Sequence, residues 1–78
     1  SLGNINISQL KNECDIKSST EDGDISISYM NPPKNTLLQL QSESGNTKIE
    51  NKAFNGEKVG KGKHVIESYT DNGDIYIK

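Results

Sequence analysis

The residues of this chain best suited to chemistry are the carboxylates around two of its glycines. Asp22 and Asp24 lie on either side of one glycine, and Asp71 and Asp74 lie around another. Carboxylate oxygens are ligands that calcium prefers, so Asp24 and Asp74 are weak candidates for a metal site. The calcium-binding nonapeptide of repeat proteins needs a repeated Gly-Gly-x-Gly-x-Asp, which the chain lacks. We therefore expect these side chains to cap the turn backbone, with no metal and no other cofactor bound.

The same aspartates raise the question of glycoside hydrolysis, which uses a pair of carboxylates. If Asp24 and Asp74 lay two coils of a β-helix apart, roughly 9.6 Å would separate them, at the long end for an inverting pair. A turn edge is not a cleft, however, and 78 residues leave little room for a walled site. We expect no enzyme activity and assign no catalytic residue.

Cysteine and histidine each occur once, as Cys14 and His64. A single cysteine excludes an internal disulfide, and a lone histidine excludes a histidine-rich metal cage. Cys14 shares the alternating phase of Ile16, so we expect it to pack inward as a small hydrophobe. The alternative is a reactive or intermolecular thiol. His64 follows a lysine-rich loop and is expected to be exposed.

Two features could bind a partner. Lys58, Lys61 and Lys63 form the one local basic cluster, and they could touch anionic polymers or acidic lipid head groups. The alternative is a solvated, flexible corner. Tyr76 alternates with two isoleucines that should point inward, so its ring should point outward and could join a glycan or protein contact.

The composition excludes several classes of protein. All 9 basic residues are lysines, so the arginines that read nucleic acids are absent, and the net charge is −2. No apolar run approaches the roughly 20 residues that span a membrane. Apolar residues make up only 29% of the 78 residues, too few for a broad core. Residues 1–4 have neither the basic start nor the apolar stretch of a signal peptide, and we expect residues 1–78 to be one domain, a C-terminal fragment of a longer exported protein.

One pattern recurs four times along the chain. A glycine is followed by Asp or Asn and then by alternating residues, usually isoleucine, and three copies carry Thr or Ser three residues before the glycine. The glycines are Gly3, Gly23, Gly45 and Gly73, and the hydroxyl residues are Thr20, Ser42 and Thr70. Alternation with Ile, Ser and Thr indicates strands, so each copy is predicted to be strand, glycine turn, strand.

The glycines recur at intervals of roughly 20 residues or slightly more. Repeats of this length predict a β-solenoid in which equivalent residues stack about 4.8 Å apart. Ile25, Thr47 and Ile75 should form one inward column, and the hydroxyl residues a polar column at the turn. The stretches 31–35 and 53–63, which contain prolines and glycines, should form loops outside the sheets. The alternative is a set of antiparallel hairpins in a roll or sandwich, which explains each turn but not the matching flanks.

Residues 60–77 and 20–27 contain the unit T-x-x-G-D-I-x-I. This unit resembles that of bacterial adhesin-like domains, β-helix-like surface domains of unknown function. The third copy departs from the unit, because Asn46-Thr47 stands in place of Asp-Ile. The resemblance implies an exported, surface-exposed module and carries over no catalytic residues.

The sequence therefore predicts an all-β, short parallel β-solenoid of about three coils with structural turns at Gly23, Gly45 and Gly73. We expect an extracellular or cell-surface, non-catalytic interaction or adhesion module that binds an envelope or host polymer or protein. The alternative is a structural spacer or oligomerisation element, since open solenoid ends can self-associate.

Overall fold

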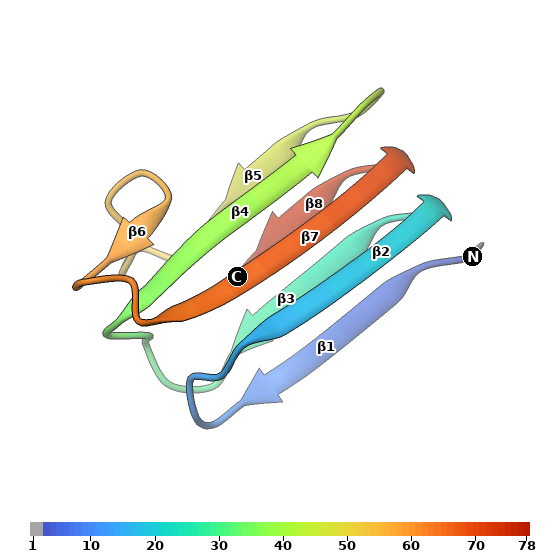
Figure 1. Ribbon diagram of the computed structural model, residues 1–78. Coiled ribbons are helices and arrows are strands. Elements are labelled where there is room, and N and C mark those ends of the chain that lie inside the picture. The colour runs from blue at the N-terminus through green and yellow to red at the C-terminus, as the bar shows by residue number, and fades with distance from the viewer. Residues whose placement is uncertain (1–2) are drawn as a thin grey trace.

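The computed structural model describes residues 3–78 as two four-stranded sheets that face each other, with no helix in that part of the chain (Figure 1). The β1 sheet has the order β1-β3-β8-β5 and the β2 sheet the order β2-β7-β4-β6. The strands are β1 (Ile5–Leu10), β2 (Ile16–Asp22), β3 (Ile25–Tyr29), β4 (Thr36–Ser42), β5 (Thr47–Ile49), β6 (Lys58–Val59), β7 (His64–Asn72) and β8 (Ile75–Ile77).

Each glycine turn carries the chain from one sheet to the other. The strands before and after Gly23 are β2 and β3, which belong to different sheets and pair with other strands. Those pairs are parallel, as are β3–β8, β4–β7 and β5–β8, while the short β6 lies antiparallel to β4. The all-β, solenoid-like expectation is therefore confirmed, and the hairpin alternative is wrong. We call β2–β3, β4–β5 and β7–β8 the three units.

The units do not stack in chain order. The unit β7–β8 lies between β2–β3 and β4–β5, so the inward column runs Ile5, Ile25, Ile75, Thr47. The expected members of this column are confirmed, but Thr47 is exposed at its end instead of being buried within it. This order stabilises the fold because it places two isoleucines in the middle and leaves the polar threonine at the rim.

The core is a narrow double column. Its fully buried apolar side chains come from β3, β4, β7 and β8, namely Ile25, Ile27, Leu38, Ile66, Ile75 and Ile77. Hydroxyl side chains complete the interior toward the turns, including the buried Thr20 and Thr70, as the polar column predicted. Each unit buries only a few side chains between its two facing strands. The fold therefore needs few apolar residues, which explains the low apolar content of the chain.

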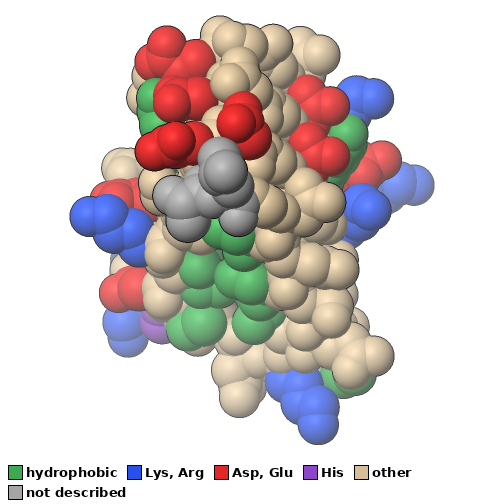
Figure 2. Space-filling view, turned by 90° about the vertical axis from the view of Figure 1, so that its right-hand side faces the viewer, with side chains coloured by type: hydrophobic (Ala, Val, Ile, Leu, Met, Phe, Trp, Pro, Cys, Tyr) green, Lys and Arg blue, Asp and Glu red, His purple; other side chains and the backbone are tan. Residues whose placement is uncertain are grey.

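The two ends of the stack differ. At the β4 end, the segment 50–63 folds over the edge, where β6 pairs with β4 and Phe54 packs against the core and near Tyr29. The stretch 53–63 was expected to lie outside the sheets, which is wrong for Lys58–Val59, because this strand pairs with β4 and makes the segment a cap. At the other end, β1 and β2 have a strand partner on one side only within residues 3–78. Figure 2 shows hydrophobic side chains reaching the surface on the side of the molecule where β1 lies.

Cys14 is exposed, so its predicted inward position is wrong. Residues 11–15 form the loop between β1 and β2, and regular alternation begins only at Ile16. The alternating phase of a strand therefore does not extend back to the cysteine.

We predict that Ile25→Ala lowers the free energy of unfolding by about 2–5 kcal/mol, because it leaves a cavity in the middle of a packed column. Chemical denaturation followed by circular dichroism measures this loss. Ile49→Ala is the matched control, because Ile49 belongs to the neighbouring column but is only partly buried at the rim. An equal or larger loss for Ile49→Ala would contradict the column assignment.

Candidate functional site

The glycine turns line up along one side of the stack, which we call the turn edge. A hydroxyl in each unit donates to a glycine carbonyl in the neighbouring layer. Thr20 Oγ1 donates to the Gly3 carbonyl at 2.9 Å and Thr70 Oγ1 to the Gly23 carbonyl at 3.0 Å. Ser42 Oγ donates likewise to the Gly73 carbonyl at 2.6 Å. The repeated hydroxyl therefore ties each layer to the next.

The Asp or Asn after each glycine forms a second ladder along the turn edge. The backbone N–H of Asp24 donates to Asn4 Oδ1 at 2.8 Å, and that of Asp74 donates to Asp24 Oδ1 at 2.8 Å. The N–H of Asn46 continues the series to Asp74 Oδ1 at 2.9 Å. This bond, followed by one from the Tyr76 hydroxyl, lowers the pKa of the Asp74 carboxyl.

These contacts correct two expectations about the aspartates. Asp24 and Asp74 lie in adjacent layers, not two coils apart, because β8 pairs directly with β3. Each carboxylate caps the backbone of the neighbouring turn and not that of its own. Within residues 3–78, no three His, Cys, Asp or Glu side chains are grouped so that they could hold a metal ion.

The glycines are required because the turns approach each other closely. A Cβ atom added at Gly45 would lie 2.0 Å from the Gly73 carbonyl oxygen, and one at Gly73 would lie 2.0 Å from that of Gly23. Gly45 has no left-handed backbone, so space alone excludes a side chain there. The structural role predicted for Gly23, Gly45 and Gly73 thus comes from the close approach of neighbouring layers, which leaves no space for a side chain.

We predict that Gly45→Ala destabilises the fold by roughly 1–3 kcal/mol through this overlap. Gly56→Ala is the control, because a Cβ there meets nothing within 4 Å although its φ of 71° is strained for alanine. Thermal melts of both variants compare the stability lost through steric overlap at Gly45 with the stability lost through backbone strain at Gly56. If Gly56→Ala costs as much as Gly45→Ala, close approach is not the reason for the glycine.

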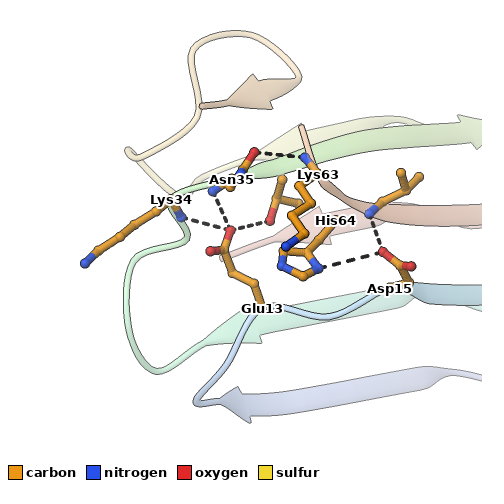
Figure 3. A network of polar contacts seen from close by, with 8 residues as sticks. Glu13, Asp15, Lys34, Asn35, Lys63 and His64 are labelled. Carbon is orange, nitrogen blue, oxygen red and sulfur yellow. Dashed lines mark hydrogen bonds and ion pairs between the residues drawn. The ribbon is translucent and has the colours of Figure 1, made fainter. Parts of the chain in front are cut away.

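The opposite side of the stack, the loop edge, gathers the loops 11–15, 30–35 and 50–63 (Figure 1). Glu13 holds two of these loops together with one carboxylate oxygen (Figure 3). Glu13 Oε1 accepts from the N–H of Lys34 at 2.9 Å, the N–H of Asn35 at 2.6 Å and the Thr36 hydroxyl at 2.6 Å. Burial opposes ionisation of Glu13, but these donors outweigh it and lower its pKa.

Asn35 and Asp15 attach the third loop (Figure 3). Asn35 Oδ1 accepts from the N–H groups of Lys61 and Lys63 at 3.0 and 2.8 Å, and its carbonyl accepts from the N–H of His64. Asp15 Oδ1 accepts from the N–H of Val65 and lies 3.9 Å from His64 Nδ1. His64 is therefore only partly exposed, contrary to expectation.

We predict that Glu13→Gln destabilises the chain at neutral pH and that this difference from wild type shrinks in acid. A carboxyl whose folded pKa is lowered stabilises the fold above its ordinary pKa of 4.5, and this contribution is lost as the pH falls through the folded value. Melting temperatures at pH 7 and pH 3 measure it, with Glu67→Gln on the exposed sheet face as the control. A difference that is constant with pH would refute the role of the ionised carboxylate.

The structure separates the two predicted binding features. Lys58, Lys61 and Lys63 are exposed at the loop edge. Asn35 accepts hydrogen bonds from the backbone of Lys61 and Lys63, so the loop that carries the cluster is attached to the neighbouring loop. Tyr76 points outward from the β1 sheet, close to the turn edge, where its hydroxyl donates to Asp74 Oδ2 at 3.1 Å. Lys78 Nζ lies 5.6 Å from the centre of its ring. Tyr76 and the three lysines therefore cannot form one site.

With this geometry in place, comparison with known proteins decides the family. The model of the family described as Toastrack DUF4097 matches residues 1–78. The chain belongs to the Toastrack family. Neither the search of curated proteins nor that of solved structures finds a significant match. The family has no assigned activity, so any function of this Toastrack domain has to be argued from its own surfaces. In the described part of the domain, no helix has the length and apolar character needed to cross a membrane.

The charges of the Toastrack domain are unevenly divided between its two edges. The turn edge carries carboxylates at the strand ends, namely Glu21, Asp22, Asp24, Glu43, Asp71 and Asp74. The loop edge carries exposed lysines, namely Lys11, Lys34, Lys58, Lys61 and Lys63. In Figure 2 acidic side chains crowd the upper part of the molecule. The loop edge also carries Lys52 and four carboxylates, of which Glu13 and Asp15 accept backbone N–H groups and Glu50 and Glu57 are exposed. Lysines outnumber carboxylates there, whereas the turns 21–24, 43–46 and 71–74 contain no lysine, so the two edges differ in charge.

Sequence reasoning missed the roles of Glu13, Asn35 and Tyr69. Tyr69 lies over a shallow groove on the outer face of the β2 sheet, together with Lys17, Gln39 and Gln41. Its hydroxyl donates to the Asp71 carboxylate, which raises the pKa of Tyr69 to about 12. Alternation along β7 could have placed Tyr69 outward. No local signal marks Glu13 or Asn35, because their partners are distant in the sequence.

Proposed function

We propose that this Toastrack domain, a β-solenoid of about three coils, is a non-catalytic cell-surface module that binds an anionic polymer through its loop edge. The observation that carries this proposal is the difference in charge between the edges: exposed lysines outnumber the carboxylates at the loop edge, and the turns of the other edge carry carboxylates and no lysine. Such an arrangement orients the molecule in the field of a polyanion, with the acidic edge turned away.

The lysines are presented from fixed points. Asn35 holds the N–H groups of both Lys61 and Lys63, and a Cβ added at Gly60 would lie 2.2 Å from the Lys34 carbonyl. The backbone of three cationic residues is therefore packed together before any ligand arrives. Binding then has to order only the side chains, which reduces its entropic cost.

The chemistry of lysine favours a repeating anion over a planar, bidentate one. An ammonium group is a point charge with three freely turning donors, and the domain has no arginine fork. A chain of phosphates or uronic acid carboxylates at the cell envelope offers many equivalent charges and needs no fixed angle. Tyr76, near the other edge, is left out of this contact.

The carboxylates at the loop edge argue against hydrolysis of the bound polymer. A general acid at neutral pH needs a raised pKa, whereas hydrogen bonds lower that of Glu13. Asp15 accepts the N–H of Val65 and faces His64. Both carboxylates thus serve to hold the loops that carry the lysines.

We predict that the domain binds polyglycerol phosphate and polygalacturonate but not neutral dextran, and that added salt weakens binding. Lys61→Gln combined with Lys63→Gln should weaken it roughly tenfold or more at low salt, because each lysine near an anionic surface contributes about 1 kcal/mol. Biolayer interferometry with immobilised polymer measures the affinities.

The matched control is Lys17→Gln combined with Lys48→Gln, which removes the same charge from strands β2 and β5, outside the loops that carry the lysine cluster. It should lose little affinity. Equal losses for the two double variants would mean that net charge alone matters, and the proposed site would be abandoned. Binding to dextran, or release of new reducing ends from polygalacturonate, would also contradict the proposal.

A further inference from the structure

The ladders at the turn edge have a direction. Each layer offers its glycine carbonyl and its Asp or Asn side-chain oxygen to the next layer, which supplies a hydroxyl and a backbone N–H. The series runs from Gly3-Asn4 through Gly23-Asp24 and Gly73-Asp74 to Gly45-Asn46. One end of the stack therefore finishes with donors and the other with acceptors.

At the donor end, no other part of residues 3–78 packs against the open side of Gly3, which we call the slot. At Gly23, Gly73 and Gly45, a Cβ atom would run into the glycine carbonyl of the layer before, at 2.3, 2.0 and 2.0 Å. At Gly3 the same atom would meet no heavy atom of the described chain within 4 Å, although this glycine also has a positive φ, of 113°. The backbone of this first turn is thus shaped for a carbonyl that none of the three units supplies.

Beside this slot, the first half of β1 is an edge with little protection. β1 contains no charge and no proline, and its one protective feature, a bulge with a positive φ at Gln9, comes after Ile7 and leaves Ile5–Ile7 regular. Ile5 and Ile7 are only partly buried, whereas their neighbours Ile25 and Ile27 are fully buried. An added parallel strand would complete both inward columns.

The acceptor end offers the complementary groups. β5 is the outer strand of its sheet, and the cap formed by β6 lies in the other sheet, against β4. Asn46 donates its N–H to Asp74, and no further layer follows in residues 3–78. In the pattern of the ladder, its side-chain oxygen is the group that would accept from such a layer. Thr47 is exposed and Ile49 partly buried, so the last rung of each column is accessible.

We propose that the Gly3 end of one molecule accepts the β5 end of a second copy of this chain. The Gly45 carbonyl of the second copy enters the slot at Gly3, and its Asn46 Oδ1 accepts the N–H of Asn4. β5 then lies parallel to β1, with Thr47 and Ile49 against Ile5 and Ile7. This contact repeats the one between layers within the chain. Because the two surfaces differ, association is head-to-tail and extends in a line.

Sedimentation velocity over a rising concentration series tests the contact, in neutral buffer without polymer, so that it is independent of the proposed function. The mass should grow with concentration through dimers to longer species. Gly3→Ala should abolish this growth, because the added methyl group fills the slot. Asn46→Ala should weaken each contact roughly three- to tenfold, the effect of one lost hydrogen bond, while its N–H still binds Asp74.

The polarity gives a sharper test. A chain with Gly3→Ala keeps an intact β5 end, and a chain with Asn46→Ala keeps an intact Gly3 slot. At a concentration at which each variant alone is monomeric, mixing the two should therefore give a heterodimer. Glu67→Gln, on the exposed face of β7 in the middle of the stack, should associate as wild type does. A wild-type chain that stays monomeric, or a Gly3→Ala chain that still associates, would overturn the proposal. Thermal melts of dilute samples establish that each variant is folded.

Discussion

The whole fold depends on how closely one turn can approach the next. Parallel strands stack at about 4.8 Å, and at the turn edge this spacing brings glycine carbonyls against the Cα atoms of other glycines. A side chain larger than hydrogen would push the layers apart and break the hydroxyl and backbone ladders together. The apolar columns stay narrow because these polar ladders, repeated in every layer, supply the order that a thick core provides in other small domains.

This arrangement leaves the surfaces free for other purposes. The turn edge is occupied by its own hydrogen bonds, whereas the loop edge brings together three loops that differ in length and sequence. Substitutions in these loops do not disturb the ladders, provided that Glu13 and Asn35 still join them. Function in solenoids concentrates on such variable edges, and six of the 9 lysines stand in these loops.

Much of this fold follows from local sequence. The glycine turns, the alternating isoleucines and the hydroxyl column are each coded within a few residues, so strands and column members could be predicted. The order of the units could not, because nothing near Thr47 or Ile75 states which layer will be the outer one. The position of Cys14 was mispredicted because alternation was extended into a loop. At the candidate site, the lysine cluster is visible in the sequence, but its rigidity depends on contacts between residues more than twenty positions apart.

The insertion of β7–β8 between the two earlier units has a consequence for how the chain is made. β2 and β4 are both complete when residue 42 has been synthesised, yet each needs β7 as its partner, and pairs such as Ile16 and Ile66 are fifty positions apart. Until residues 64–78 have left the ribosome, both sheets are incomplete and their strands have unpaired edges. Folding is therefore expected to be late, all at once and slow, since long-range pairing has to overcome the entropy of closing large loops. Until then, the nascent chain is most exposed to pairing with the wrong strand.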